Sequence, residues 1–447
     1  LEAQGVIFFG DLHYVMAFME TCCVILASGS VQEVIDLAPI AHLAAIKGRL
    51  PFVHFFDGFR TSHEVQKVEA LSYEELAGLI DKKALQEFRE RSLSPNHPVT
   101  RGTAQNPDIY FQTREACNPF YENIIPIVEE YMAKINALTG RNYSLFNYYG
   151  AKDAEYVIVA MGSVCGTIEE TIDYFNEQGE KYGLVEVHLF RPFSIQHFRE
   201  AVPKTAKRIA VLDRTKEPGA PGEPLYLDVR NSFYGCQDAP LIIGGRFGLG
   251  SKDTTPAEIK AVFDNLKSTQ PKSGFTIGIV DDVTHSSLPS SEKIITAKPG
   301  TVRCKFWGLG SDGTVGANKQ AVKIIGEHTD QYVQAYFAYD SKKSGGLTTS
   351  HLRFGNHPIK SAYLIDEADY IACHNQSFVH SYDLLKGLKQ KGTFVLNCMW
   401  DSSELEEHLP KKMLYEIAEN EIDFYCINAI KIAEEIGLGN MINMIMQ

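Results

Sequence analysis

The chain has 447 residues, of which 44% are hydrophobic and 22% charged, a composition typical of globular proteins and unlike that of disordered ones. Its formal net charge of −13 argues against a nucleic-acid partner, because binding phosphates requires a basic face. The sequence contains no apolar run of about eighteen residues or more, so it predicts no membrane span.

The nine cysteines are dispersed, apart from the adjacent Cys22 and Cys23, and no two are spaced as Cys-x-x-Cys. Because that spacing is typical of zinc and iron–sulfur ligands, we expect no metal site in this chain. We interpret the cysteines as reduced thiols that pack as small hydrophobic side chains, in a reducing compartment.

The first segment begins at Leu1, with no signal sequence ahead of its first strand-like run. We therefore expect the chain to begin inside a domain and to be part of a longer protein. The segment is predicted to hold strands at 6–9, 22–27 and 52–56 and a helix at 31–46 that follows the N-cap residue Ser30.

Three polar residues, Asp57, Arg60 and His63, follow the strand at 52–56. Ligands of parallel α/β sheets bind at the carboxyl ends of strands, so this loop is a candidate site. The alternative, which we favour, is a network that ties the strand to the next helix, since ion-pair networks without a catalytic role are common.

Residues 72–91 are predicted to be helical and 92–118 to form an extended surface segment. A helix of about five turns or fewer, which includes 129–134, is predicted to end near Gly140. A domain boundary is expected near 147–152.

The second segment alternates regularly between strand and helix. A buried strand at 156–162 precedes a helix that Ser163 or Thr167 caps. The other predicted elements are strands at 184–189, 208–212 and 241–243 and helices at 198–202 and 258–266. This alternation predicts a parallel, doubly wound sheet. Arg214 and Lys216 lie just beyond the end of a strand. They could contact a ligand or a neighbouring subunit, or they could form surface ion pairs, and the sequence leaves these alternatives open.

The third segment follows an interval rich in Ser, Thr and Pro, residues 269–301, in which we expect a short hairpin. A strand at 302–306 leads into a glycine-rich turn and then a helix from Lys319. Unpaired N–H groups at a helix N-terminus, approached closely past glycines, favour a phosphate ligand. A tight turn that binds nothing is an equal alternative, because the spacing matches neither the dinucleotide nor the nucleoside-triphosphatase fingerprint.

The candidate ligand-binding residues of this turn and helix are Gly308, Gly310, Ser311, Asp312, Gly313, Thr314 and Lys319. Later strands are predicted at 333–339, 370–374, 393–396 and 423–427. Between the first two lies a polar loop at 340–350 that contains Lys342 and Lys343. We leave open whether this loop binds a second anionic group beside the first or is a solvated basic loop.

Long stretches of the chain resemble pyruvate:ferredoxin (flavodoxin) oxidoreductase, and together they cover practically the whole sequence. They are FFDGFRTSHEVQK, VIVAMGSVC, LDRTKEPGAPGEPLYLDV, GGRFGLGSKDTTP, FWGLGSDGTVGANK, YDSKKSGG, HLRFGNHPIKS, ACHNQSFV and GLGNMINMIMQ.

The resemblance implies three successive α/β domains with mainly parallel, doubly wound sheets. Residues 1–150 correspond to an N-terminally incomplete pyrimidine-side thiamine diphosphate domain, and 151–268 to a transketolase-C-like domain. Residues 269–301 would be a linker, and 302–447 a Rossmann-like gamma domain associated with coenzyme A. Phosphates of coenzyme A would suit the helix N–H groups together with Lys319, Lys342 or Lys343.

The family oxidatively decarboxylates pyruvate to acetyl-CoA and CO2 and passes electrons through [4Fe–4S] clusters to ferredoxin or flavodoxin. Its cofactors are thiamine diphosphate with Mg2+, and the resemblance implies a homodimer in the cytoplasm or a hydrogenosome-type organelle. The thiamine-activating glutamate, the cysteine-rich region and the domain that holds thiamine and its metal have no counterpart in this sequence. We therefore expect the chain to be inactive alone.

Met19 departs from the family pattern, which has an arginine there that holds the substrate carboxylate. Methionine has no hydrogen-bond donor, so weakened pyruvate binding is expected. Tyr14 similarly stands where the pattern has an acidic residue, and Met441 where it has arginine. A non-catalytic or scaffolding paralogue is the alternative function, and a flavin- or NADP-linked version of the enzyme is not distinguished.

Overall fold

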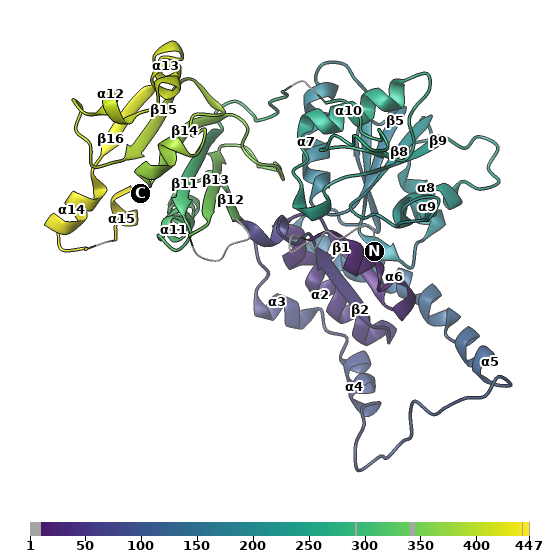
Figure 1. Ribbon diagram of the computed structural model, residues 1–447. Helices are drawn as coiled ribbons and strands as arrows, with labels where there is room; N and C mark the ends of the chain where they lie inside the picture. Colours follow the sequence, from purple (N-terminus) through teal and green to yellow (C-terminus); the bar gives the residue numbers. More distant parts are fainter. Residues whose placement is uncertain (1–9, 291–292, 340–344, 440, 447) are drawn as a thin grey trace. The chain divides into compact units, whose positions relative to one another are not determined.

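The structure is a computed structural model that describes residues 10–290, 293–339, 345–439 and 441–446 (Figure 1). The chain divides into two compact units. In the described ranges, the larger unit consists of residues 10–61 and 68–290, and the smaller unit of residues 62–67 and the described residues from 293 onward. None of the helices in the described ranges has the length and apolar character needed to cross a bilayer.

The larger unit contains two sheets. Its elements are α1 (His13–Met16), η1 (Met19–Thr21), β1 (Val24–Ser28), α2 (Val31–Gly48), β2 (Phe52–Phe56), α3 (Tyr73–Gly78), α4 (Lys82–Glu90), α5 (Tyr110–Glu115), α6 (Asn118–Thr139), β4 (Phe146–Gly150), β5 (Tyr156–Ala160), α7 (Val164–Asn176), β6 (Tyr182–Val187), β7 (Leu189–Arg191), α8 (Ile195–Ala201), β8 (Arg208–Asp213), α9 (Pro224–Ser232), β9 (Leu241–Arg246), η3 (Leu249–Ser251), α10 (Pro256–Lys267) and β10 (Phe275–Thr276).

The first sheet has the strand order β2-β1-β7, with β1 parallel to β2 and antiparallel to β7. The second has the order β10-β9-β8-β5-β6-β4 and is parallel except for the edge strand β4. α7 and α10 pack on one face of the second sheet, and α8 and α9 pack on the opposite face. The predicted doubly wound α/β sheet is thereby confirmed.

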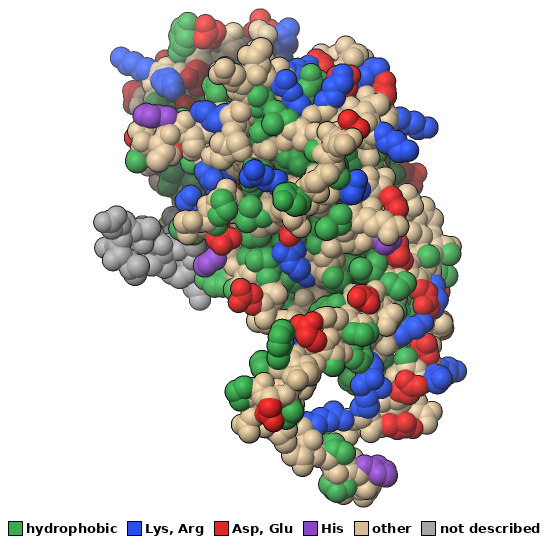
Figure 2. Space-filling view, turned by 90° about the vertical axis from the view of Figure 1, so that its right-hand side faces the viewer, with side chains coloured by type: hydrophobic (Ala, Val, Ile, Leu, Met, Phe, Trp, Pro, Cys, Tyr) green, Lys and Arg blue, Asp and Glu red, His purple; other side chains and the backbone are tan. Residues whose placement is uncertain are grey.

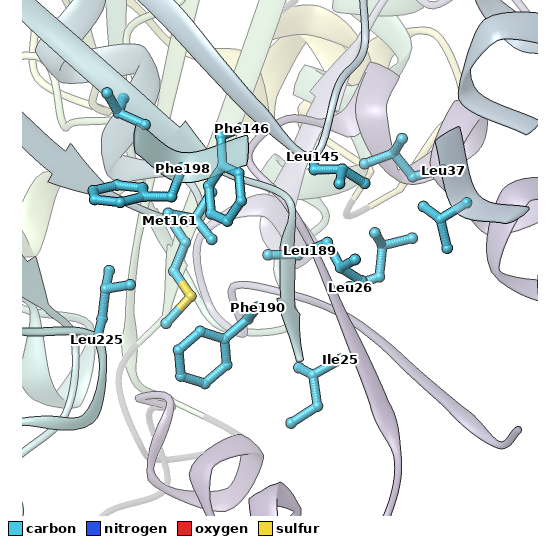
Figure 3. Close-up of a cluster of buried hydrophobic side chains, with 14 of the residues drawn as sticks. Ile25, Leu26, Leu37, Leu145, Phe146, Met161, Leu189, Phe190, Phe198 and Leu225 are labelled. Atoms are coloured by element: carbon cyan, nitrogen blue, oxygen red, sulfur yellow. The ribbon is translucent and has the colours of Figure 1, made fainter. Parts of the chain in front are cut away.

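The chain passes from the second sheet to the first at a single residue, His188. β6 ends at Val187 and β7 begins at Leu189, and the carbonyl of His188 accepts a hydrogen bond from Ala27 N in β1 (2.7 Å). The two sheets therefore share one hydrophobic core. In Figure 3 side chains from both sheets, such as Leu26 of β1 and Phe146 of β4, lie in the same buried cluster.

The smaller unit contains one mixed sheet of seven strands. Its elements are β3 (Glu64–Gln66), β11 (Val302–Leu309), α11 (Thr314–His328), β12 (Tyr332–Tyr339), β13 (Leu347–Gly355), β14 (Ala368–Cys373), η4 (Gln376–His380), β15 (Leu388–Asn397), α12 (Leu405–His408), α13 (Lys411–Glu419), β16 (Asp423–Ile427), α14 (Ala429–Glu435) and α15 (Asn443–Met446).

The strand order of this sheet is β16-β15-β14-β11-β13-β12-β3. The first four strands are parallel, whereas β13, β12 and β3 each pair antiparallel with their neighbours. α11 packs on β11, β12 and β13. Figure 2 shows one face of the protein, on which Lys and Arg side chains are interspersed with Asp and Glu.

The strongly patterned elements lie where the sequence predicts them. α2 begins after Ser30, whose hydroxyl accepts a hydrogen bond from Glu33 N (3.2 Å). The buried strand β5 and the end of α6 at Gly140 are also confirmed. The strand predicted at 6–9 lies outside the described residues.

The helix predicted to have about five turns or fewer is longer. α6 has 22 residues, or about six turns, and it begins inside the stretch predicted to be extended. Pro119 occupies the first turn of α6, where proline is favourable because its missing N–H is not needed. α5 also lies in that stretch, so the prediction of an extended 92–118 is wrong in part.

The interval 269–301 contains no hairpin in its described part. Instead β10 pairs parallel with β9, and Thr276 forms a parallel bridge with Ser287. The strand β4 occupies the boundary expected near 147–152 and belongs to the second sheet of the larger unit. The assignment of residues 1–150, 151–268 and 302–447 to three functional domains stays a prediction.

Candidate anion-binding site

The glycine-rich turn joins the end of β11 to the start of α11 in the smaller unit. The helix begins at Thr314, five positions before the predicted start at Lys319. The prediction was late because the first residues of the helix do not show apolar residues at helical spacing. Gly313 is the N-cap residue and has a φ of 88°, a left-handed conformation that favours glycine.

Gly308 and Gly310 shape the turn. A Cβ on Gly308 would lie 2.7 Å from the Cβ of Thr314, so glycine is needed for the helix to start directly on the strand. The N–H of Gly310 donates to the carbonyl of Gly346 (2.7 Å), which ties the turn to the residue before β13. These two glycines therefore have structural roles, whatever the turn binds.

Asp312 holds the turn closed from inside. Its carboxylate accepts hydrogen bonds from Leu309 N and Thr314 N, each 2.8 Å long. An anionic side chain at a helix N-terminus stabilises the helix, but it also occupies donors that a phosphate would use and repels a second anion. An anion that binds here would therefore use the other donors of the first turn, and a ligand-binding role for Asp312 stays a prediction.

The donors that remain are the N–H groups of Val315 and Gly316, which at the start of a helix have no intrahelical acceptor. Gly316 is exposed, and a Cβ on it would meet no atom within 4 Å. Lys319, also exposed, lies one turn further along, with its Nζ 5.3 Å from the centre of the Phe337 ring. These groups leave an open, cationic approach to the helix N-terminus.

Buried polar side chains lie between α11 and the sheet. The Asn318 amide nitrogen and the hydroxyls of Thr348 and Ser350 have no hydrogen-bond partner within the described ranges. In the β11–β13 register Gly308 faces Thr348 and Phe306 faces Ser350, so both hydroxyls flank the end of β11. Buried polar groups are normally paired, and unpaired ones beside an open helix end indicate a place for a polar ligand.

His374 is a further buried polar residue beside the start of α11. Its Nδ1 lies 2.8 Å from the Thr314 hydroxyl, and its Nε2 has no partner among the residues that the structure describes. Burial lowers the pKa of His374 to about 4, so the imidazole is neutral near pH 7. If the hydroxyl donates to Nδ1, Nε2 carries the proton and is a free donor.

Lys342 and Lys343 lie outside the described residues. The other part of the predicted polar loop is not a loop, because β13 begins at Leu347 and Thr348–Ser350 are strand residues. Sequence reasoning did not select Asn318 or His374. The position of His374 directly after β14, at the end of a parallel strand, is the signal that could have found it.

The other polar residues singled out in the sequence form a buried network in the larger unit. Arg214 is 3% exposed and pairs with Asp57, with Nη1 and Oδ1 2.9 Å apart. Asp57 also accepts hydrogen bonds from the N–H and hydroxyl of Ser163 (2.8 and 2.5 Å). Arg60 pairs with Asp253 (2.8 Å). These contacts make Asp57 and Arg60 part of a structural network, but the network links the end of β2 to Ser163, Arg214 and Asp253 and not to the next helix as predicted. The partner of Arg214 is a buried carboxylate.

His63 belongs to the smaller unit, where its Nδ1 lies 3.3 Å from the carbonyl oxygen of Phe337. Lys216 is exposed.

Met19 lies in η1 of the larger unit, beside an arginine from β7. The Nη2 atom of Arg191 is 3.2 Å from the Met19 sulfur, and Nη1 pairs with Asp228 (2.6 Å). A guanidinium is thus present next to position 19, although it is supplied by a different strand.

Models of three protein families match successive parts of the chain. Residues 1–133 match the thiamine diphosphate-binding domain of pyruvate flavodoxin/ferredoxin oxidoreductase. Residues 154–259 match core domain II of pyruvate:ferredoxin oxidoreductase, and residues 303–447 match pyruvate ferredoxin/flavodoxin oxidoreductase.

Two solved structures show weak similarity. A pyruvate oxidoreductase subunit of Thermotoga maritima is 16% identical, with a TM-score of 0.26, over 32% of this chain and 71% of that chain. The 2-oxoglutarate:ferredoxin oxidoreductase of Magnetococcus marinus, solved with 2-oxoglutarate, coenzyme A and succinyl-CoA bound, is 14% identical, with a TM-score of 0.32, over 55% of this chain and 41% of that chain.

Much closer relatives match along the full sequence. The pyruvate-flavodoxin oxidoreductase of Enterobacter agglomerans is 61% identical over 448 residues, and the pyruvate:ferredoxin oxidoreductase of Moorella thermoacetica is 59% identical over 447. Both alignments cover 100% of this chain and 38% of the relative. The chain thus spans 38% of the length of these relatives, and throughout that span it belongs to the pyruvate:ferredoxin (flavodoxin) oxidoreductase family.

Proposed function

We propose that the chain is part of an enzyme that oxidatively decarboxylates pyruvate to acetyl-CoA and CO2 and passes the electrons to ferredoxin or flavodoxin. The observation that carries this proposal is the 59–61% identity, along the whole chain, to enzymes named for that activity. No comparison supports the alternative of a non-catalytic paralogue.

Within this enzyme, we assign the binding of coenzyme A to the start of α11. Coenzyme A supplies the thiol that accepts the acetyl group, and its diphosphate and 3′-phosphate carry the negative charge. The N–H groups of Val315 and Gly316 would receive a phosphate, with the Lys319 ammonium beside it. The unpaired Asn318 amide and His374 imidazole would bind neighbouring polar groups of the same ligand. Lys342 and Lys343 are retained in the proposal from the sequence alone.

The remaining cofactors are proposed at the level of the enzyme. Thiamine diphosphate belongs with the first segment, whose family model is named for it. The [4Fe–4S] clusters are assigned to regions of the relatives that this chain does not match, because its cysteines lack cluster spacing. Mg2+ is assigned to the same regions because the resemblance places the domain that holds thiamine diphosphate and its metal outside this sequence. The enzyme would act as a homodimer in the cytoplasm.

Pyruvate binding is proposed to be weakened by Met19, which has no donor for a carboxylate. The Arg191 guanidinium lies beside that position, but its pairing with Asp228 leaves only part of the group available to a substrate.

Calorimetric titration of coenzyme A into the 447-residue chain tests the α11 site. We expect saturable binding that weakens as salt is added, because exposed charge–phosphate contacts are screened. The variant Lys319→Ala should lose about tenfold in affinity, as expected when a hydrogen bond to a charged group is removed.

The matched control is Lys323→Ala, which removes an exposed lysine one turn further along the same helix. It changes the net charge equally but leaves the helix start intact, so its affinity should stay within about twofold of the unmodified chain. Equal losses in the two variants, or no heat at millimolar coenzyme A, would overturn the assignment of this site.

A further inference from the structure

A second group of side chains with ligand chemistry lies in the larger unit, where the chain crosses from one sheet to the other. His188 is the crossing residue between β6 and β7, Glu186 lies in β6, and Glu33 lies in the first turn of α2. His188 is 2% exposed and Glu186 7%. None of these residues contributes to the coenzyme A proposal.

The three side chains converge on one point. His188 Nε2 is 3.5 Å from Glu33 Oε2 and 3.8 Å from Glu186 Oε2. One ligand atom from each residue lies within 4.8 Å of the other two. Bonds of about 2.0–2.2 Å around a tetrahedral zinc ion separate its ligand atoms by about 3.4 Å, so small side-chain movements would close the group around a cation.

The histidine is oriented as a metal ligand. Its Nδ1 lies 2.9 Å from the carbonyl oxygen of Ser144, and since a carbonyl only accepts, Nδ1 carries the proton. In the neutral ring Nε2 then presents its lone pair to the two carboxylates. That buried nitrogen has no hydrogen-bond partner within the described part of the chain, which is the independent sign that a ligand is missing there.

The carboxylates are also held in place. Glu33 Oε2 accepts a hydrogen bond from Gly29 N (2.5 Å). A Cβ on Gly29 would lie only 2.5 Å from Glu186 Oε1, so glycine at this position leaves the space that the Glu186 carboxylate occupies. Supporting contacts of this kind fix metal ligands and tune their affinity.

The charge of the group calls for a cation. Among the described residues no lysine or arginine forms an ion pair with Glu33 or Glu186. Buried charges in proteins are paired or coordinate a metal, so two carboxylates that converge on one imidazole favour a cation between them.

We propose that Glu33, Glu186 and His188 bind a first-row divalent cation, for which Zn2+ is the best match. The imidazole ligand disfavours Mg2+ and Ca2+, which prefer oxygen ligands only, and suits zinc. The cation would join α2 to the two sheets at their crossing point. Its role would be structural, a link between elements that are far apart in the sequence.

The test is a titration of the chelator-treated 447-residue chain with Zn2+ by calorimetry and with Co2+ by visible absorption. We expect one site per chain, with a Co2+ spectrum of nitrogen and oxygen ligands and without the charge-transfer band of a thiolate. Glu186→Gln and His188→Gln should each weaken binding by at least about 100-fold. Circular dichroism would establish that each variant is folded.

The matched control is His197→Gln. His197 also pairs with a glutamate, Glu129 (3.2 Å), but unlike His188 it does not lie between two carboxylates among the described residues. This variant should bind like the unmodified chain. A thiolate band, equal affinity in all variants, or no binding at millimolar metal would overturn the proposal, leaving a group whose charge is balanced by protons alone. If one of the two variants fails to fold, the other still decides between these outcomes.

Discussion

His374 illustrates how burial sets the charge of a single residue at the candidate site. The side chain is 4% exposed, and desolvation of the imidazolium lowers its pKa to about 4. The unfolded chain has an ordinary histidine pKa of about 6.5. The folded state therefore holds the proton less tightly than the unfolded state.

The sign of the resulting pH dependence is definite. The contribution of His374 to the free energy of unfolding is fully present above pH 6.5 and is lost as the pH falls toward 4, by up to about 3 kcal/mol. Urea unfolding followed by tryptophan fluorescence gives the free energy of unfolding of the unmodified chain and of His374→Gln. We expect the difference between the two free energies to shrink as the pH falls from 6.5 to 4.

Tryptophan is a suitable probe because both tryptophans, Trp307 and Trp400, belong to the smaller unit with His374. The control is His380→Gln, since His380 is exposed at the end of η4 and its replacement should change the free energy of unfolding by less than about 0.5 kcal/mol. A difference for His374→Gln that does not change with pH would contradict the burial argument.

At the scale of elements, the turn before α11 and the first turn of α11 contain two glycines with different steric surroundings. Gly308 cannot carry a side chain without displacing Thr314, whereas Gly316 faces open space. Glycine in a helix is less stable than alanine by about 0.5–1 kcal/mol. The presence of Gly316 therefore has a stability cost that the folded chain alone does not explain.

We expect Gly316→Ala to raise the free energy of unfolding by about 0.5–1 kcal/mol and to weaken coenzyme A binding, because the added methyl group would obstruct a phosphate at the helix N–H groups. Chemical unfolding and calorimetric titration measure the two effects. Gly78→Ala in α3, where a Cβ also meets no atom within 4 Å, should be neutral in binding. Unchanged affinity in Gly316→Ala would remove the phosphate from this turn.

The elements that the sequence predicts well are those whose signals are local. β5 and α2 have apolar patterns or an N-cap residue that act within a few positions. β13 was missed because its sequence, LTTSHLRFG, has polar residues on a strand that becomes buried only through pairing with β11 and β12.

The same distinction applies to the candidate site. The glycines of the turn are visible in the sequence, because their spacing is local. The contact between Thr314 and His374 joins residues 60 positions apart, and the convergence of Glu33 with Glu186 and His188 depends on how two sheets are connected. Such contacts follow from packing and not from any short motif.

At the scale of the whole molecule, the two units have separate hydrophobic cores and separate candidate ligands. Ligands that bind only the folded state stabilise it, by about 2.7 kcal/mol at 100 times the dissociation constant. Differential scanning calorimetry should show two transitions. Coenzyme A should raise the transition that tryptophan fluorescence also reports, and Zn2+ should raise the other.

Each ligand serves as the control for the other in this experiment. A single transition whose midpoint temperature both ligands raise equally would show that the two units unfold together. It would contradict the expectation that each ligand stabilises only the unit that contains its site.

The short strand β3 has a consequence for how the protein is made. It is the edge strand of the smaller unit's sheet, yet it is encoded between elements of the larger unit. The Gln334 amide in β12 donates to the Glu64 carboxylate in β3, across 270 residues of sequence. At synthesis rates of about 5–20 residues per second, β3 leaves the ribosome about 15–50 s before its partner strand exists. A nascent chain must therefore carry an unpaired strand through the synthesis of the second, longer part of the larger unit, and a chain released before β12 would keep it exposed.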